Sequence, residues 1–262
     1  MTRPPAKVGD PIASVDTPSL VVDLSAMERN MEKMAAFAKN ANVRMRPHAK
    51  THKCGMVAQR QLALGAVGVC CQKVSEAEAM VAAGVSDVLV SNEIVGEQKV
   101  SRLATLAKQA TISVLADHPD IVSAYSDAAQ RFGVTIGVLV ELYSGGIRAG
   151  VHSPEAALEL ARIIEMAPGL RFGGLQAYRG PAQHIRPFEE RRDAADEWCA
   201  NVRVARDLLE QNGLKCESVT GVGTGTCALE VANGVYTEIQ VGSYAFMDVE
   251  YGLNRDEADN PI

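Results

Sequence analysis

The sequence predicts an α/β protein with a TIM-type (β/α)8 barrel, and three observations lead to that fold. Short apolar segments alternate with helical segments along most of the chain. The apolar segments are too continuous for a sheet with one face in water, which indicates parallel strands covered on both faces. Eight such segments in 262 residues fit one closed barrel better than an open doubly wound sheet.

An extra strand is predicted ahead of the barrel. Residues 20–24 read LVVDL and follow the turn signal at residues 16–18, and Ser25 is the expected N-cap of a helix that runs to about Lys39. Because eight later strands complete the barrel, we expect residues 20–24 to lie outside it and to pair with another part of the protein. The predicted organisation is a lead-in with the extra strand at residues 1–24, the barrel at residues 25–252 and a truncated tail at residues 253–262.

The barrel strands are assigned from apolar runs that end at turn signals. The first begins at Val43 and stops where Pro47 removes a backbone donor. The others are predicted at residues 67–71, 87–91, 111–115, 135–141, 171–177, 216–220 and 237–241. The helices between them are predicted at residues 55–64, 75–83 with Ser75 as the N-cap, 97–109, 119–132, 153–168 and 188–212.

Composition argues against several functional classes. The formal net charge of -6 and the pI near 5.5 argue against a nucleic-acid-binding surface, which needs a basic stripe. No apolar run approaches the ~20 residues of a membrane span, and the N-terminus lacks the apolar centre of a signal peptide. The six cysteines include the adjacent pair Cys70-Cys71 but no CxxC spacing, so they predict neither a zinc site nor a disulfide framework. We therefore expect a cytoplasmic protein with reduced thiols.

The stretch RPHAKTHK at residues 46–53 carries the strongest indication of chemistry. It directly follows the first barrel strand, and ligands bind at the carboxyl ends of the strands in such sheets. A lysine held there, partly desolvated and close to other cations, is less stable as an ammonium ion and can act as an amine nucleophile. Lys50 is therefore a candidate for a Schiff base with a carbonyl compound or with pyridoxal phosphate. The alternative is a basic loop that faces water.

Two glycine-containing segments follow the seventh and eighth strands. Residues 220–226 read TGVGTGT, and residues 242–244 read GSY. Backbone N–H groups exposed in such turns can bind a phosphate, and the Thr224 hydroxyl adds a donor. Phosphate sites in these barrels are frequently built from the loops after strands seven and eight. A plain tight turn is the alternative interpretation of each run alone.

Other polar residues near strand ends leave several interpretations open. Arg148 could face a carboxylate, the pyridine nitrogen of a cofactor, or solvent. Tyr178 ends an apolar strand and could contact a ring or serve only in packing. For His118, His152 and His184 a surface or packing role is favoured. The sequence has no HxH, HExxH or carboxylate cluster, so no metal-ligating residue is predicted.

Several segments, in order along the chain, closely resemble one family of enzymes. They are DTPSLVVDL, RPHAKTHK, GVCCQKVSEAEA, LQAYRG with QH following, TGVGTGT and VYTEIQVGSYAFMD. These are similar to segments of the D-threonine aldolase and 3-hydroxy-D-aspartate aldolase group, which are pyridoxal phosphate enzymes of the alanine racemase-like fold, fold type III. The resemblance covers about residues 9–252.

The resemblance implies roles for particular residues. Lys50 is implied to be the Schiff-base lysine, which makes it the one expected catalytic residue. Gln72, Arg148 and Tyr178 resemble the residues around the pyridoxal ring. The phosphate is expected to contact residues of the two glycine-containing segments, namely Gly223, Thr224, Gly225, Gly242, Ser243 and Tyr244.

The reaction implied by the resemblance is retro-aldol cleavage of a D-3-hydroxy amino acid, such as D-threonine, to glycine and an aldehyde. The alternatives are a non-catalytic pyridoxal phosphate-binding protein of cofactor homeostasis and a D-serine dehydratase or racemase. The family implies a homodimer and a divalent metal, Mn or Mg, whose ligands lie in a C-terminal β domain that this chain does not include. The chain departs from the family pattern at Tyr143, where an aspartate is usual, and at Val222, which replaces a glycine.

Overall fold

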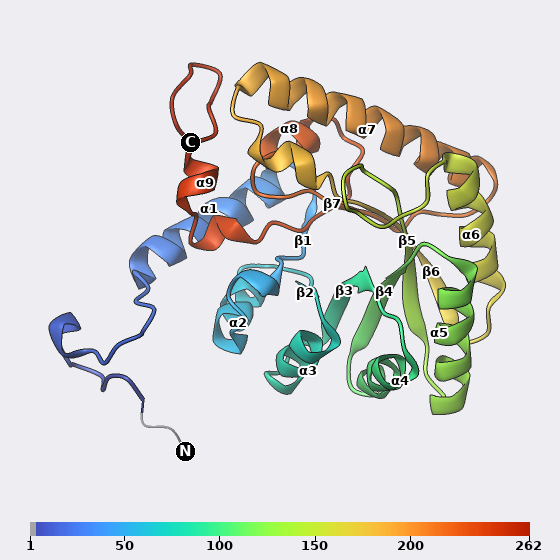
Figure 1. Ribbon diagram of the computed structural model, residues 1–262, viewed down its shortest axis with the longest axis horizontal. Coiled ribbons are helices and arrows are strands. Elements are labelled where there is room, and N and C mark those ends of the chain that lie inside the picture. The colour runs from blue at the N-terminus through green and yellow to red at the C-terminus, as the bar shows by residue number, and fades with distance from the viewer. Residues whose placement is uncertain (1–3) are drawn as a thin grey trace.

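Parallel strands form one eight-stranded sheet in the computed structural model, which describes residues 4–262 (Figure 1). The strands are β1 (Arg44–Met45), β2 (Val69–Cys71), β3 (Asp87–Glu93), β4 (Thr111–Ala116), β5 (Ile136–Glu141), β6 (Leu170–Ala177), β7 (Ser218–Gly221) and β8 (Glu238–Ile239). Each coincides with a predicted apolar run. The prediction holds because strands covered on both faces must be apolar along their whole length.

The sheet closes into a barrel. Its strand order is β1-β8-β7-β6-β5-β4-β3-β2, so β1 and β2 are the two ends. Backbone hydrogen bonds join these ends, because the Val67 N–H donates to the Met45 carbonyl (2.9 Å) and the Cys70 N–H donates to the Pro47 carbonyl (2.8 Å). The predicted (β/α)8 barrel is therefore confirmed.

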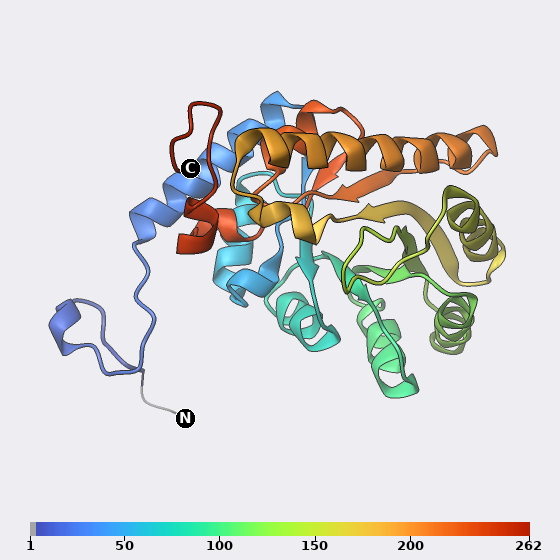
Figure 2. The same ribbon diagram turned by 45° about the horizontal axis from the view of Figure 1, so that its top comes forward.

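Helices cover the outside of the sheet in both views (Figures 1 and 2). They are α1 (Leu24–Asn40), α2 (Gly55–Ala63), α3 (Val74–Ala82), α4 (Glu97–Leu106), α5 (Pro119–Phe132), α6 (Pro154–Met166), α7 (Phe188–Gln211), α8 (Cys227–Ala232) and α9 (Val249–Gly252). Two of the predicted N-caps are wrong. Asp23 precedes α1 and accepts the Ala26 N–H (2.9 Å), and Ser75 lies inside α3, which begins one residue earlier. Helix α8 was not predicted, because six residues after a glycine run give too short a periodic pattern.

Residues 20–24 do not form the predicted strand, but they lie outside the barrel as expected. Residues 20–23 belong to no helix or strand, and Leu24 is the first residue of α1. Figure 2 shows this segment leading away from the barrel. A strand needs a neighbouring backbone to pair with, and no described residue pairs with this one, so Leu20 is 99% exposed. Residues 1–3 of the predicted lead-in lie outside the described residues.

The interior of the barrel has an apolar half and a polar half. Cys70, Leu89, Leu115 and Leu139, from β2 to β5, form a separate buried cluster inside the ring of strands. On the opposite side, Gln176 of β6 and Gln240 after β8 exchange amide hydrogen bonds of 3.2 and 2.7 Å. Because these amides satisfy each other, they can stay buried beneath a polar site.

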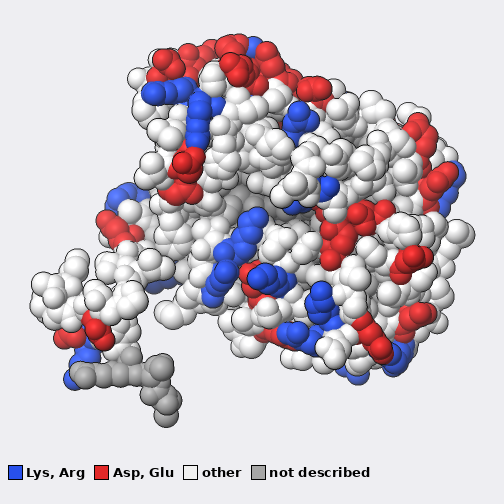
Figure 3. Space-filling model, viewed as in Figure 1, with Lys and Arg blue, Asp and Glu red and all other residues white. Residues whose placement is uncertain are grey.

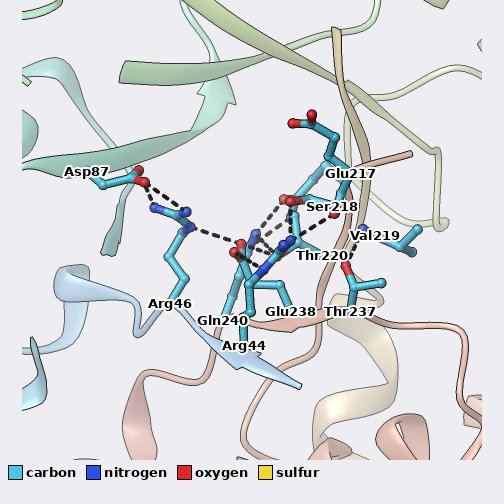
Figure 4. A network of polar contacts seen from close by, with 11 residues as sticks. Arg44, Arg46, Asp87, Glu217, Ser218, Val219, Thr220, Thr237, Glu238 and Gln240 are labelled. Carbon is cyan, nitrogen blue, oxygen red and sulfur yellow. Dashed lines mark hydrogen bonds and ion pairs between the residues drawn. The ribbon is translucent and has the colours of Figure 1, made fainter. Parts of the chain in front are cut away.

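A network of charged groups fills the amino-terminal end of the barrel (Figure 4). The Arg46 guanidinium lies between Glu238 (Nε to Oε1, 2.9 Å) and Asp87 (Nη1 to Oδ1, 2.6 Å). Arg44 approaches the other oxygen of Glu238 (Nε to Oε2, 3.4 Å). These contacts tie β1 to β8 and β3 at the position where β1 and β8 are only two residues long.

The residues after β8 pack back onto the barrel. Asn254 is fully buried, and its Nδ2 donates to the Gln183 carbonyl (3.0 Å) in the 3-10 helix η3 (Gly180–His184). The Arg255 N–H donates to the Arg186 carbonyl (2.9 Å). The segment predicted as a tail is therefore hydrogen-bonded to the loop after β6. None of the helices formed by residues 4–262 is both long and apolar enough to cross a membrane.

Candidate cofactor site

A pocket opens at the carboxyl ends of the strands. It encloses about 470 Å³ of empty space, part of which is open to solvent. Figure 3 shows a hollow near the middle of this face, with Lys and Arg side chains along its lower edge. Its lining residues come from the strands, or from the segments that follow them, at every strand except β4. They are His48, Lys50, Thr51, Gln72, Ser91, Arg148, Gln176, Tyr178, Gly221, Gly223, Thr224, Gln240, Gly242, Ser243 and Tyr251.

Lys50 lies in the 3-10 helix η2 (Ala49–Thr51) directly after β1 and lines this pocket. Burial, together with the nearby Arg148 cation, lowers the pKa of its amine. Its Nζ lies 5.9 Å from the centroid of the Tyr178 ring. Lys50 is an exposed residue, yet it lines the cleft beside another cation, and an amine in this setting is a better nucleophile than a fully solvated one.

His48 was not singled out as a site residue, yet it holds the turn that carries Lys50. Its Nδ1 accepts the Lys50 backbone N–H (3.4 Å), and its Nε2 lies 3.1 Å from the Ser91 hydroxyl. That hydroxyl in turn donates to the Cys71 carbonyl (3.3 Å). Burial and the Lys50 charge lower the pKa of His48 well below its usual value, so the ring is neutral. A histidine two residues before the lysine was the available signal.

Arg148 faces a carboxylate, which was one of the three interpretations left open by the sequence. It forms an ion pair with Glu141, the buried last residue of β5, and its guanidinium lies 5.3 Å from the centroid of the Tyr178 ring. Burial and a hydrogen bond with Glu93 raise the pKa of Glu141 to about 9, against the opposing effect of Arg148. Arg148 is thus fixed at the edge of the pocket, next to the tyrosine.

The glycines that line the pocket are places where the backbone approaches closely. An added Cβ would lie 2.2 Å from the Ala177 carbonyl oxygen at Gly221, and 2.7 Å from the Thr51 hydroxyl oxygen at Gly242. No side chain therefore covers the backbone N–H groups of these loops. With the hydroxyls of Thr224 and Ser243 beside them, the two loops form a cradle suited to a phosphate. The residues present thus fit pyridoxal phosphate, because one pocket has both an amine, Lys50, and a cradle for a phosphate.

Two expected phosphate contacts are not part of the pocket lining. The Gly225 N–H already donates to Gln183 Oε1 (3.0 Å). The Tyr244 ring is buried away from the pocket, where its hydroxyl accepts a hydrogen bond from Gln61 Nε2 (3.0 Å). Its backbone N–H, however, donates to the Thr224 hydroxyl (3.2 Å), so the main chain at Tyr244 lies next to the cradle.

The two departures from the family pattern lie outside the pocket lining. Val222 has a φ of 24° and a fully buried side chain, so its isopropyl group packs in the core instead of pointing at the ligand. The strain of a β-branched residue with positive φ is of order 1–3 kcal/mol. The Tyr143 ring packs on His152, with centroids 4.2 Å apart.

Other lining residues carried too little sequence signal. Gln176 and Gln240 form the floor of the pocket, and Tyr251 comes from α9, beyond the last strand. Single glutamines within strands and a lone tyrosine in a short helix look like ordinary packing. His184 packs against Tyr251, with ring centroids 4.7 Å apart. Its place beside the pocket was therefore not expected.

Residues 4–262 contain no group of three or more His, Cys, Asp or Glu side chains placed to hold a metal ion. All six cysteines, which fall within these residues, are free thiols.

A buried carboxyl group lies behind the cradle and gives the protein a testable pH dependence. Glu230 of α8 accepts the Thr226 hydroxyl (2.8 Å) through Oε2, while Oε1 has no partner among the described residues. Burial raises the pKa of Glu230 from about 4.5 to about 8. A raised acid pKa means that folding stability is fully present below the unfolded pKa and is lost as pH rises toward 8, by at most about 1.4 kcal/mol per pH unit.

The E230Q variant is therefore expected to become more stable than the wild type as pH increases from 5 to 8. Urea unfolding of both proteins at several pH values measures the difference. If the wild type and E230Q had equal free energies of unfolding at pH 8 as well as at pH 5, ionisation of Glu230 would cost little stability and the prediction would be wrong.

Comparison with known proteins relates the fold and the pocket to a known group. The family model described as "Alanine racemase, N-terminal domain" matches residues 22–250. A D-threonine aldolase from Arthrobacter sp is 49% identical over 259 residues, covering 99% of this chain and 68% of the relative. A 3-hydroxy-D-aspartate aldolase from Paracoccus denitrificans (strain Pd 1222) is 46% identical over 254 residues, covering 96% of this chain and 66% of the relative.

A solved structure gives the same result. The crystal structure of D-threonine aldolase from Filomicrobium marinum superposes with a TM-score of 0.96 at 49% sequence identity, covering 97% of this chain and 69% of that chain. The chain thus spans about two thirds of the length of these relatives.

Proposed function

Because the chain belongs to the alanine racemase N-terminal domain family, and within it to the D-threonine aldolase and 3-hydroxy-D-aspartate aldolase group, we propose that it is a pyridoxal phosphate-dependent lyase. Its reaction is the cleavage of a D-3-hydroxy amino acid to glycine and an aldehyde. The observation that carries this proposal is that the Lys50 amine, whose pKa is lowered, and the two glycine-containing loops line the same pocket.

The residues of the pocket have different roles in this proposal. Lys50 would supply the amine that holds the cofactor through its aldehyde, and its lowered pKa leaves more of the amine unprotonated. Glu141 pairs with Arg148, and the Arg148 guanidinium lies against the Tyr178 ring. Held in this way, Arg148 and Tyr178 would orient the pyridine ring. Bound in this way, pyridoxal phosphate supplies an electron sink for the charge left on Cα when the Cα–Cβ bond breaks.

The roles proposed for the cradle follow from its donors. The loops after β7 and β8 meet the phosphate with backbone N–H groups and with the hydroxyls of Thr224 and Ser243. An added Cβ would meet Gln183 at Gly223 and Thr51 at Gly242, so the loops need glycine at both positions to keep this shape. Gln72 lines the same pocket as Lys50, and we propose that it would contact the ring.

Further parts of the proposal rest on the family. We propose that the activity depends on a divalent metal, Mn or Mg, for which residues 4–262 supply no set of three or more ligands. A small D-amino acid is the substrate, and a homodimer is the assembly. The six free thiols support a cytoplasmic location.

Purified protein incubated with pyridoxal phosphate and D-threonine is expected to release glycine and acetaldehyde when Mn²⁺ is present, and less of both without it. L-threonine serves as the stereochemical control and is expected to give no glycine. Release of ammonia and pyruvate from D-serine would instead support a dehydratase. Cofactor binding without turnover of any of these compounds would support a binding protein.

A further inference from the structure

We propose that Gln183 is a positioning residue that holds residues 221–226 in the shape that accepts the cofactor phosphate. This inference rests on the proposed binding of pyridoxal phosphate. Gln183 belongs to η3, in the loop after β6, and does not line the pocket itself. It therefore acts through the loop that it contacts.

Both polar atoms of the Gln183 side-chain amide form hydrogen bonds with this loop. Its Oε1 accepts the Gly225 N–H (3.0 Å), and its Nε2 donates to the Thr226 hydroxyl oxygen (2.7 Å). The Thr226 hydroxyl then donates to Glu230 (2.8 Å), so the chain of donors and acceptors is consistent. Gln183 is only 1% exposed, and at this depth water cannot replace a lost hydrogen bond.

The loop is also fitted to Gln183 by shape. An added Cβ at Gly223 would lie 2.3 Å from Gln183 Oε1, and one at Gly225 would lie 2.1 Å from the Gln183 carbonyl oxygen. The glycines of the TGVGTGT run are therefore needed partly to admit this glutamine. By taking the Gly225 N–H, Gln183 directs that peptide away from the pocket and leaves the Gly223–Thr224 part of the loop facing it.

Gln183 is itself held in place from two directions. The Asn254 side chain donates to its carbonyl (3.0 Å), and its own Nε2 also lies 3.3 Å from the Arg179 carbonyl oxygen. Asn254 is fully buried and follows α9, so the end of the chain supports the same glutamine. The amide is thus fixed before any ligand arrives, which is what a positioning residue requires.

The test compares pyridoxal phosphate with pyridoxal, which lacks the phosphate. Both are titrated into wild type and Gln183→Met, a substitution of similar length without the amide. We expect the dissociation constant for pyridoxal phosphate to rise about tenfold or more, because a buried donor and acceptor lose their partner, while that for pyridoxal stays within about twofold. Gln59→Met is the matched control, since this exposed glutamine donates to the Ala83 carbonyl (2.9 Å) far from the cradle.

Thr226→Val removes the hydrogen bond between the Gln183 amide and the Thr226 hydroxyl from the loop side. It provides a second variant in case Gln183→Met does not fold. It is expected to weaken pyridoxal phosphate binding in the same direction. Unchanged binding of pyridoxal phosphate by Gln183→Met, or an equal loss for both ligands, would overturn the proposal. Because the readout is binding, a wild type that binds the cofactor but leaves D-threonine intact would refute the proposed reaction and leave this inference standing.

Discussion

Replacing Lys50 with alanine is expected to remove covalent attachment of pyridoxal phosphate and to lower glycine release by about 10³-fold or more. No other amine lines the pocket among the described residues, so nothing can take over its bond to the aldehyde. Loss of the residue that forms a covalent intermediate generally removes most of the rate enhancement.

Borohydride reduction of the loaded protein followed by peptide mass spectrometry measures the attachment directly. In the wild type the label is expected on the peptide that carries Lys50, and in the variant it is expected to be absent. Lys53→Ala is the control, because Lys53 lies in the same basic stretch but does not line the pocket. A label on another lysine of the wild type would refute the assignment.

Replacing Glu238 with glutamine is expected to lower the free energy of unfolding by about 3 kcal/mol. The Glu238 side chain is 2% exposed and receives both Arg44 and Arg46, as Figure 4 shows. Removing the charge leaves the Arg46 guanidinium, 12% exposed, with Asp87 as its remaining charged partner. Breaking a buried pair in this way is costly because one ion stays desolvated.

Urea unfolding measures this effect, and Glu217→Gln is the matched control. Glu217 and Glu238 line one cavity at the amino-terminal end of the barrel. Glu217 pairs with Arg171 (2.5 Å), but its side chain is 54% exposed. Its loss is expected to cost less than about 1 kcal/mol. Equal effects of the two substitutions would mean that burial does not set the strength of the Glu238 contacts.

The strands, and the position of Lys50 in a pocket at the strand ends, could be predicted because their signals are local in the sequence. Apolar runs such as residues 111–115 and 135–141 need no knowledge of their neighbours to indicate buried strands. Residues 20–24 carry the same apolar pattern, yet they form no strand, because pairing depends on a partner backbone that the pattern does not reveal. The amino-acid sequence of that segment alone could not show whether it forms a strand.

The parts of the site that could not be predicted depend on contacts between distant residues. Glu141 was visible only as the end of a strand, and its ion pair with Arg148 gives it a role in the pocket. Gln183 is 42 residues away from the Gly225 N–H that it accepts. A polar residue has the same appearance in the sequence whether its partner is water or a buried amide, so burial had to be seen in the structure.

The pairing of β1 with β8 brings together segments 192 residues apart, at Arg46 and Glu238. Such a contact closes a very long loop, and the entropy of that closure has to be overcome before the contact stabilises anything. During folding, the turn that carries Lys50 and the loop at Gly242, Ser243 and Tyr244 can therefore meet only after β8 has been made. An incomplete chain ending before β8 has the lysine but no place for it to act.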